Sequence, residues 1–381
     1  MYKLFRPVLF RLDPEVAHHL TLQLMRFGGF RPINSLLQML YTAPKKPVEA
    51  FGLTFKNPVG LAAGYDKDGI ALRGLSALGF GHIEVGTVTP RPQLGNPKPR
   101  VFRLVDDEAV INRMGFPGKG VQYVEMTLRG ARKWRRGNHQ LNGEAQNDRR
   151  LLWGFAPRND MILGMNLGKN KDTPLEEAAS DYIALMRTFA PLADYLTINI
   201  SSPNTVGLRR LQGREMLENL LGEIEKERRR TKQKGHEAHK GKQKKSTENP
   251  MSPVMENIPI LVKLAPDLTD DELDDALAVI LDSGMDGIIA TNTTLAREGL
   301  GSKHREETGG LSGSPLRVRS EAMLEKIVRR VKGRVPIVSV GGIMSPEDAK
   351  RRLDMGATLV QVYTGLIYRG PGLVKEIVKR I

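Results

Sequence analysis

The chain has 381 residues, 40% of them hydrophobic and 27% charged, which is enough apolar content for a full core and excludes a wholly disordered protein. It contains no cysteine, which excludes disulfides, thiolate metal sites, iron–sulfur clusters and a cysteine nucleophile or base. No apolar run approaches the ~18 residues of a membrane-spanning helix, and the N-terminus lacks the features of a signal peptide. The formal net charge is +15, and segments 129–150 (seven basic, two acidic residues) and 226–245 (ten basic, two acidic) carry most of it.

Residues 1–45 differ in pattern from the rest of the chain and are predicted to form a helical extension. Asp13-Pro14 is a helix-start signal and Gly28-Gly29 ends that helix, while a second helical run covers 34–41. Apolar side chains cover two stripes of the first helix and nearly all of the second. This surplus of apolar surface indicates either a helical hairpin at the membrane interface or an ordinary helical extension packed on the main domain.

From about residue 46 to 381 short apolar runs alternate with helical patterns. The strand-like runs are 58–62, 82–87, 161–167, 195–200, 259–264, 286–291, 335–340 and 358–363. Helical stretches fall near 68–79, 117–129, 174–190, 214–229, 270–284, 315–332, 345–356 and 372–381, and Thr173-Pro174 is one of their start signals. Eight such units predict the α/β class and a (β/α)8 TIM barrel. The alternative is a doubly wound open sheet, but that fold usually has fewer strands, and no GxGxxG or Walker A motif is present.

Two basic insertions, at about 130–160 and 228–257, interrupt this alternation. The second is expected to be a disordered surface loop. Such a tract can bind nucleic acid or anionic lipid, but it is more often a solvated insertion. His236 and His239 lie in it without the HExxH spacing, and we expect no metal site.

Polar residues gather at the carboxyl ends of the predicted strands, where barrels carry their active sites. Acidic pairs and histidine clusters are absent there, which argues against glycoside hydrolysis and against a metal centre. Several amides together suit a planar, heavily hydrogen-bonded ligand; they belong to Asn112, Asn166, Asn199, Asn204 and Asn292.

Two lysines and a pair of glycine-rich turns point to an anionic ligand. Lys67 and Lys263 can neutralise negative charge, and Lys263 lies inside an apolar strand, where an unpaired cation would be costly, so a buried anionic partner is expected. Gly341-Gly342 and the turn before the helical piece 365–369 come directly after the last two strands. They match the phosphate site of such barrels.

The motifs together carry a family resemblance. In chain order they are AAGYDKDG, GTVTPRPQ, NRMGF, NLGKN, NISSPNT, VKLAPD, ATNTT, TGGLSG, VGGI and QVYTG. They closely resemble dihydroorotate dehydrogenase, specifically its membrane-associated, quinone-dependent class 2. Ser202 stands where the soluble class has a catalytic cysteine, and the helical extension is present. The resemblance covers nearly the whole chain apart from the two insertions.

The resemblance implies oxidation of (S)-dihydroorotate to orotate in UMP biosynthesis, with one FMN per chain as hydride acceptor and a membrane quinone as final acceptor. Ser202 would be the catalytic base, with Thr205 and Phe116 shaping a proton relay. Dihydroorotate would be bound by Lys67, Asn112, Arg113, Met114, Gly115, Phe116, Asn199, Asn204, Asn292 and Thr293. FMN would be bound by Ala63, Gly64, Tyr65, Asp66, Lys67, Thr87, Asn166, Asn199, Lys263, Thr291, Gly313, Gly342, Tyr363 and Thr364. The inner end of a quinone tunnel would be lined by His18, Arg103 and Tyr363.

The resemblance also implies a peripheral protein on the cytoplasmic face of the cell membrane, attached through residues 1–45, monomeric and without a nucleic-acid partner. Two rival interpretations stay open. One is another FMN barrel acting on a different planar ring, against which the asparagines and Ser202 argue. The other is a basic, non-catalytic membrane- or RNA-associated protein, which predicts a colourless protein whose binding falls steeply with salt.

Overall fold

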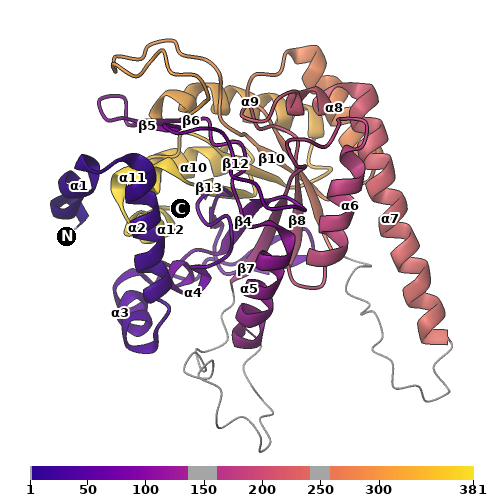
Figure 1. Ribbon diagram of the computed structural model, residues 1–381, viewed down its shortest axis with the longest axis horizontal. Helices are drawn as coiled ribbons and strands as arrows, with labels where there is room; N and C mark the ends of the chain where they lie inside the picture. The colour runs from indigo at the N-terminus through magenta and orange to yellow at the C-terminus, as the bar shows by residue number, and fades with distance from the viewer. Residues whose placement is uncertain (1, 136–160, 241–257) are drawn as a thin grey trace, which may run out of the picture.

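The computed structural model describes residues 2–135, 161–240 and 258–381. Eight parallel strands close into a barrel in the order β10-β12-β13-β3-β4-β7-β8-β9, surrounded by helices (Figure 1). The strands are β3 (Val59–Leu61), β4 (His82–Val88), β7 (Ile162–Leu167), β8 (Tyr195–Asn199), β9 (Ile260–Leu264), β10 (Gly287–Ala290), β12 (Ile337–Val340) and β13 (Leu359–Val362). Each of the eight predicted apolar runs matches one of them to within two residues at either end, so the TIM-barrel prediction is confirmed.

The outer helices alternate with the strands along the chain. They are α4 (Leu72–Ser76), α5 (Gly120–Arg135), α6 (Ala178–Phe189), α7 (Arg214–Lys240), α8 (Asp270–Asp282), α9 (Arg317–Val331), α10 (Pro346–Asp354), α11 (Thr364–Arg369) and α12 (Leu373–Arg380). Their apolar faces and the outward side chains of the strands form the largest core cluster. Strands buried on both faces in this way need apolar residues at nearly every position, which is why they are conspicuous in the sequence.

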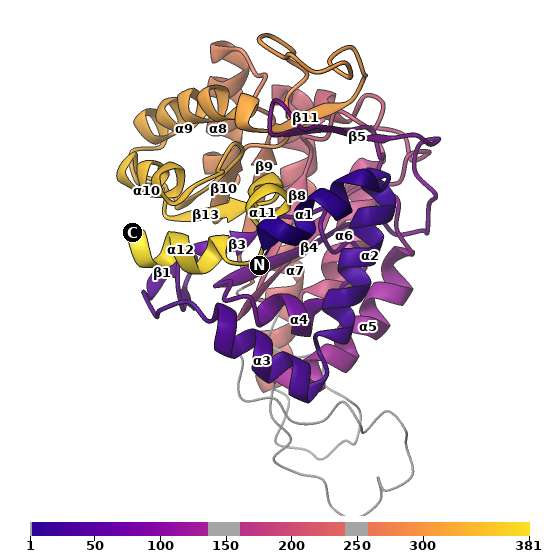
Figure 2. The same ribbon diagram turned by 90° about the vertical axis from the view of Figure 1, so that its left-hand side faces the viewer.

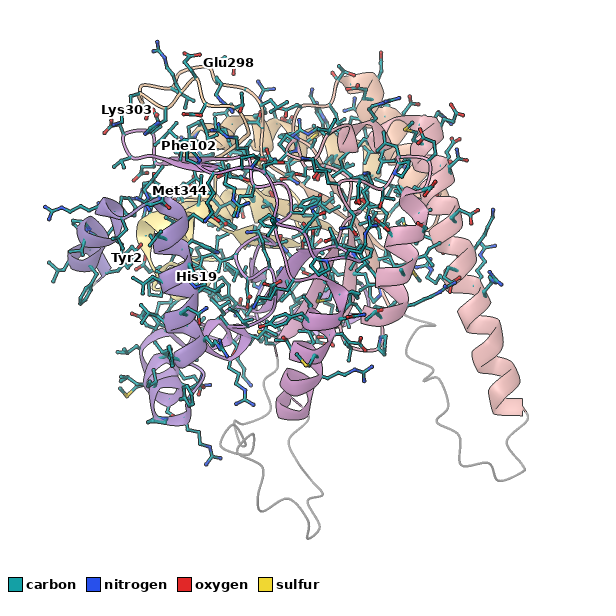
Figure 3. All side chains as sticks on the ribbon, in the orientation of Figure 1. Tyr2, His19, Phe102, Glu298, Lys303 and Met344 are labelled. Carbon is teal, nitrogen blue, oxygen red and sulfur yellow. The ribbon has the colours of Figure 1, made fainter. Side chains whose placement is uncertain are left out.

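Small sheets cover both ends of the barrel. At the amino ends of the strands, the hairpin β1 (Val48–Ala50) and β2 (Leu53–Phe55) packs Phe55 against the inner layer around Tyr195. Near the carboxyl ends, β5 (Val101–Leu104), β6 (Ala109–Asn112) and β11 (Gly310–Gly313) form an antiparallel sheet. Phe102 marks this sheet in Figure 3. Strands β5 and β6 pair as a hairpin, and β11 joins them from a position about 200 residues later in the chain.

The N-terminal extension contains three helices, where two were expected. They are α1 (Tyr2–Arg11), α2 (Pro14–Phe27) and α3 (Arg31–Tyr41), and they cover one side of the barrel (Figure 2). The Asp13 carboxylate accepts hydrogen bonds from the amides of Glu15 and Val16, as its N-cap position predicted. A Cβ added at Gly74 of α4 would lie 1.9 Å from the Met25 carbonyl oxygen, so this glycine lets α2 pack closely on α4.

Two helix boundaries differ from the sequence prediction. Helix α6 begins at Ala178 and not after Thr173, whose hydroxyl donates to Asp181 instead of capping a helix. Helix α7 continues to Lys240, so the expected disorder is wrong for residues 228–240. The Arg228 guanidinium of α7 forms an ion pair with the Asp286 carboxylate, which lies just before β10, at 2.8 Å.

The remaining parts of the two basic insertions, 136–160 and 241–257, lie outside the described residues. Helices α5 and α7, which lead into them, end on the side of the barrel opposite the β5–β6–β11 sheet (Figure 1). Within the described ranges, we find no helix with the length and hydropathy to cross a membrane.

Candidate active site

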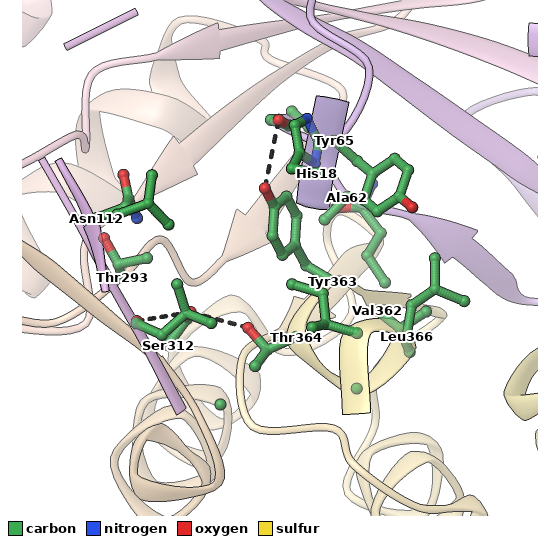
Figure 4. Close-up of a pocket in the computed structure, with 18 of the residues that line it drawn as sticks. His18, Ala62, Tyr65, Asn112, Thr293, Ser312, Val362, Tyr363, Thr364 and Leu366 are labelled. Atoms are coloured by element: carbon green, nitrogen blue, oxygen red, sulfur yellow. Dashed lines mark hydrogen bonds between the residues drawn. The ribbon is translucent and has the colours of Figure 1, made fainter. Parts of the chain in front are cut away.

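A cavity of about 410 Å³ lies at the carboxyl ends of the barrel strands and is lined on one side by residues of helices α1 and α2. Figure 4 shows part of this lining, including His18, Tyr65 and Tyr363. Every site residue predicted from the sequence lines this cavity except Asp66, Arg113, Asn166 and Thr205. The fold therefore gathers residues from all parts of the chain around one space. Their individual roles stay predictions.

Asp66 and Arg113 serve the structure around the cavity. The Asp66 carboxylate accepts hydrogen bonds from two backbone amides just before α4 (2.8 and 3.0 Å), and burial raises its pKa to about 6. The Arg113 guanidinium lies 2.6 Å from the Glu307 carboxylate and 4.5 Å from the ring centroid of Phe102. Both side chains hold loops in place.

Asn166 lies directly beneath the lining, in a polar floor made with Thr87 and Asn199. The Asn199 amide donates to the Thr87 hydroxyl at 2.8 Å and to the Asn166 carbonyl at 3.0 Å, and the Thr87 hydroxyl donates to the same carbonyl at 2.5 Å. All three are buried. Because each amide is fixed by its neighbours, this floor presents a set orientation of donors and acceptors to a ligand.

Glu84, on β4, is the key member of this floor that the sequence analysis missed. Its carboxylate is fully buried, lies 4.0 Å from the Lys263 ammonium and accepts a hydrogen bond from Asn166 at 2.7 Å. Tyr195 and Gln361 donate to its other oxygen. Burial lowers the pKa of Lys263, and the charge of Glu84 opposes that shift.

The anionic partner expected for Lys263 is thus supplied by the protein. An acidic residue within the apolar run HIEVGT was the available signal, since a buried carboxylate requires a partner.

The loop after β8 brings Ser202 and Asn204 into the lining of the cavity. The Ser202 hydroxyl accepts a hydrogen bond from the backbone amide of Asn204 (3.2 Å), and the Asn204 side chain donates to Asn112 (3.0 Å). Among the described residues, the buried Asn204 Oδ1 and Thr205 Oγ1 atoms have no hydrogen-bond partner. Unpaired buried acceptors are costly, so they indicate a polar ligand here.

Lys67 and Asn292 complete the polar wall. The Lys67 ammonium donates to the Gly64 carbonyl at 2.9 Å, and burial lowers its pKa to about 8. Asn292 donates to the Ser201 hydroxyl at 3.0 Å and accepts from the Thr293 amide at 2.8 Å. A cation beside several amides suits a planar anion.

Another part of the cavity wall is formed by glycines. Gly313, Gly341 and Gly342 all line the cavity with positive φ angles of 97°, 112° and 72°. The Gly341 carbonyl points away from the cavity, because it accepts hydrogen bonds from Ser320 and from the fully buried Arg352. A Cβ at Gly313 or Gly342 would lie 2.3 Å from backbone atoms of Glu108 or Arg317, so only glycine permits this close backbone path along the cavity wall, where backbone amides can bind a phosphate.

The end of the cavity beneath α1 and α2 is more apolar. The His18 and Tyr65 rings pack at 5.2 Å and the Tyr65 and Tyr363 rings at 5.9 Å, while Arg103 donates to the Phe10 carbonyl at 3.0 Å. Burial, together with the charge of Lys67, lowers the pKa of His18 to about 3, so this imidazole is neutral. Further lining comes from α1 and was missed because that helix was not expected; it includes Tyr2, Leu9 and Phe10.

Known proteins resemble this chain along its whole length. The family model described as dihydroorotate dehydrogenase matches residues 47–381. Relatives named dihydroorotate dehydrogenase (quinone) from Yersinia pseudotuberculosis serotype O:1b (strain IP 31758) and from Yersinia pestis are each 44% identical, over 100% of this chain and 99% of theirs.

Solved structures agree. The Eimeria tenella enzyme DHODH in complex with ferulenol has a TM-score of 0.79 and 39% identity, covering 97% of this chain and 90% of that one. Its ligand-free form has the same TM-score and 38% identity, covering 97% and 94%. On the strength of the family model and of these full-length relatives, the chain belongs to the dihydroorotate dehydrogenase family.

Proposed function

We propose that this chain oxidises (S)-dihydroorotate to orotate and passes the electrons to a membrane quinone, with one bound FMN, in UMP biosynthesis. The observation that carries the proposal is one continuous cavity. It joins an amide-rich end at Ser202 to an apolar end beneath α1 and α2. The proposed function is further supported by the match, over the full chain, to relatives named dihydroorotate dehydrogenase (quinone).

The residues present fit FMN. Thr87, Asn199 and Lys263 offer donors and a positive charge for the polar edge of the flavin ring, and Gly342 and Thr364 leave backbone amides and a hydroxyl for the phosphate. When bound, FMN would supply the hydride acceptor and relay its electrons to the quinone. A cation near the reduced ring stabilises its negative charge, which is the role proposed for Lys263.

At the substrate end, the protein's task is to hold a planar anion and remove a proton. Lys67 and the amides of Asn112, Asn204 and Asn292 would orient the ring and stabilise charge that develops on it. Ser202 would take the proton from C5 while hydride leaves C6, so that a C5–C6 double bond forms. A hydroxyl is a weak base at neutral pH, so the proton must move on, and the buried Thr205 hydroxyl is the group proposed for that relay.

At the other end, the quinone would enter between α1 and α2. His18, Arg103 and Tyr363 are the polar groups proposed to meet its head, and the surrounding side chains are apolar. A neutral His18 is compatible with an uncharged quinone. The two half-reactions would then use opposite ends of one cavity.

An anaerobic absorbance spectrum of the purified protein tests this function. We expect a bound yellow flavin that bleaches with L-dihydroorotate and recovers with a ubiquinone analogue, but not with fumarate or NAD. A bound flavin that does not bleach with L-dihydroorotate would refute the assignment of dihydroorotate as the substrate. A protein that neither contains nor binds FMN would refute the enzymatic proposal as a whole.

The pKa of Lys67 predicts a pH dependence of substrate binding. Because burial lowers this pKa to about 8, the ammonium loses its proton as the pH rises through that value. We expect KM for dihydroorotate to rise about tenfold per pH unit above pH 8, since only the cation pairs with the substrate carboxylate. Steady-state kinetics on both sides of this pKa measure the rise. Lys67→Arg should move the rise in KM to higher pH. A rise at the same pH in Lys67→Met would contradict the attribution of this pH dependence to Lys67.

We also propose that residues 1–45 attach the protein peripherally to the cytoplasmic face of the membrane. Leu4, Phe5 and Val8 of α1 are 78%, 64% and 62% exposed, and further apolar side chains of α2 and α3 lie on the surface. An apolar face of this size on neighbouring helices is unusual for a surface in contact with water alone.

Replacing Leu4, Phe5 and Val8 together with serine should weaken binding to phospholipid vesicles by about two orders of magnitude or more, because each side chain loses its transfer into lipid. Co-sedimentation with vesicles measures the partition, and flavin bleaching by dihydroorotate should be retained. Val318→Ser on α9, which is 71% exposed and outside the extension, is the matched control. Equal binding by the triple variant and the control would exclude α1 as the attachment site.

A further inference from the structure

An ion pair between a buried arginine and a half-buried glutamate joins helix α2 of the extension to the barrel. Arg100 lies just before β5, and its Nη2 and Nε atoms lie 2.7 and 3.2 Å from the two carboxylate oxygens of Glu15 in the first turn of α2. The two side chains are only 9% and 19% exposed. Burial opposes ionisation of Glu15, but the hydrogen bonds and charge of Arg100 outweigh it and lower its pKa. A two-point contact of this kind fixes direction as well as distance.

The remaining nitrogen of Arg100 holds a tight turn. Its Nη1 atom donates to the carbonyls of Leu94 and Asn96 at 2.6 and 2.9 Å. Between them, Gly95 has φ +77°, and an added Cβ would lie 2.4 Å from the Met114 carbonyl oxygen and 2.8 Å from Arg100 Nη1. The turn is therefore pressed between Arg100 and the loop after β6.

Asn96 connects this turn to two loops of the substrate end. Its backbone amide donates to the Met114 carbonyl at 2.8 Å, and its side-chain amide donates to the carbonyls of Arg113 and Asn204 at 2.9 and 3.1 Å. One side chain thus fastens the loop after β6 to the loop after β8.

From Asn204 the chain of hydrogen bonds reaches the proposed catalytic base. The Asn204 backbone amide donates to the Ser202 hydroxyl at 3.2 Å, and its side chain donates to Asn112 at 3.0 Å. An unbroken path therefore runs from Glu15 through Arg100 and Asn96 to Ser202.

We propose that Arg100 and Asn96 are positioning residues that set the substrate loop from helix α2, so that dihydroorotate oxidation depends on how the quinone-side helix is seated. The inference rests on the proposed function, because it assigns Ser202 and Asn204 to the substrate. Neither Arg100 nor Asn96 lines the cavity. They act through the loop, and a misplacement of a reacting group by about 1 Å can slow a reaction by about a hundredfold.

The test uses Glu15→Gln, Asn96→Ala and the double variant as FMN-loaded protein. Lys98→Gln is the matched control: Lys98 also contacts Glu15, at 3.4 Å, but its side chain is 68% exposed and in solvent. Stopped-flow absorbance measures flavin bleaching by dihydroorotate without quinone. Hydrogen–deuterium exchange measures the opening of residues 201–207, a readout that does not depend on turnover.

We expect each single variant to bleach about tenfold to a hundredfold more slowly, and the double variant to lose no more than the slower single one, since both changes break the same path. Exchange in 201–207 should speed up about tenfold in all three, while Lys98→Gln matches the wild type in both measurements. If Glu15→Gln does not fold, Glu15→Asp replaces it and should show the same pattern, smaller in size.

Bleaching at the wild-type rate in the single variants would overturn the inference. So would a double variant whose fold-loss is the product of the two single losses, or exchange of residues 201–207 at the wild-type rate in the variants. A wild-type flavin that dihydroorotate does not bleach would instead overturn the proposed function. In that case the exchange data alone decide whether α2 sets the loop.

Discussion

Replacing Ser202 with alanine is expected to slow flavin bleaching by dihydroorotate by roughly 10²–10⁴-fold, the usual contribution of a positioned general base. Ser202 is buried in the cavity, and its hydroxyl is oriented by the Asn204 amide. The alanine variant keeps the loop backbone and the asparagines but has no group to take the C5 proton. Stopped-flow absorbance under anaerobic conditions gives the rate directly.

The second half-reaction provides the control for this variant. Reoxidation of chemically reduced Ser202→Ala by a quinone analogue should match the wild type, because the quinone end is built from α1, α2 and Tyr363. Bound FMN and orotate affinity should also be retained within a few fold. A variant that bleaches at the wild-type rate would show that another group removes the proton. Equal slowing of both half-reactions would instead indicate a general disturbance of the cavity.

Replacing Lys263 with methionine is expected to destabilise the fold by about 3–5 kcal/mol, the cost of leaving a buried charge unpaired. Glu84 is fully buried, and the ammonium of Lys263 is the cation beside it, at 4.0 Å. Denaturant unfolding of the variant and the wild type, each at several FMN concentrations, separates this loss from any lost stabilisation by bound flavin.

The double variant Lys263→Met/Glu84→Gln distinguishes the two roles of this pair. Removing both charges should recover most of the lost stability, since the amide oxygen of Gln can accept from Asn166 and its NH2 can donate to the Tyr195 hydroxyl, which then acts as acceptor. Affinity for FMN should stay low, because the cation for the reduced flavin is still missing. A double variant no more stable than Lys263→Met would contradict the ion-pair account, and one with wild-type FMN affinity would contradict the cofactor role of Lys263.

The barrel was predictable because its strands are locally distinctive. Runs such as 259–264 are apolar on both faces, which is the pattern of a strand covered by helices outside and by the barrel interior inside. Helix α2 was equally clear, because Asp13 and Pro14 are local start signals whose action depends on only a few neighbouring residues.

The sequence was less informative where an element depends on distant contacts. Helix α1 contains Pro7 and has no buried residue. It rests on α11 through Tyr2, whose hydroxyl donates to the Ile367 carbonyl, and through Arg6, which donates to the Tyr368 carbonyl at 3.2 Å. Nothing in residues 2–11 alone identifies those partners, so neither the helix nor its contribution to the cavity could be predicted.

The eight-strand barrel, the family and the polar residues at the strand ends were all predictable, because burial pattern and local motifs are properties of short segments. Which of these residues meet could not be predicted, because it depends on how the whole chain folds. In the folded chain, Glu84 lies beside Lys263, Asn166 bonds to Asn199 in the polar floor, Arg113 pairs with Glu307, and Glu15 is linked through Arg100 to the loop of Ser202. Each of these pairs joins residues far apart in the chain, and their proximity arises only when the barrel closes.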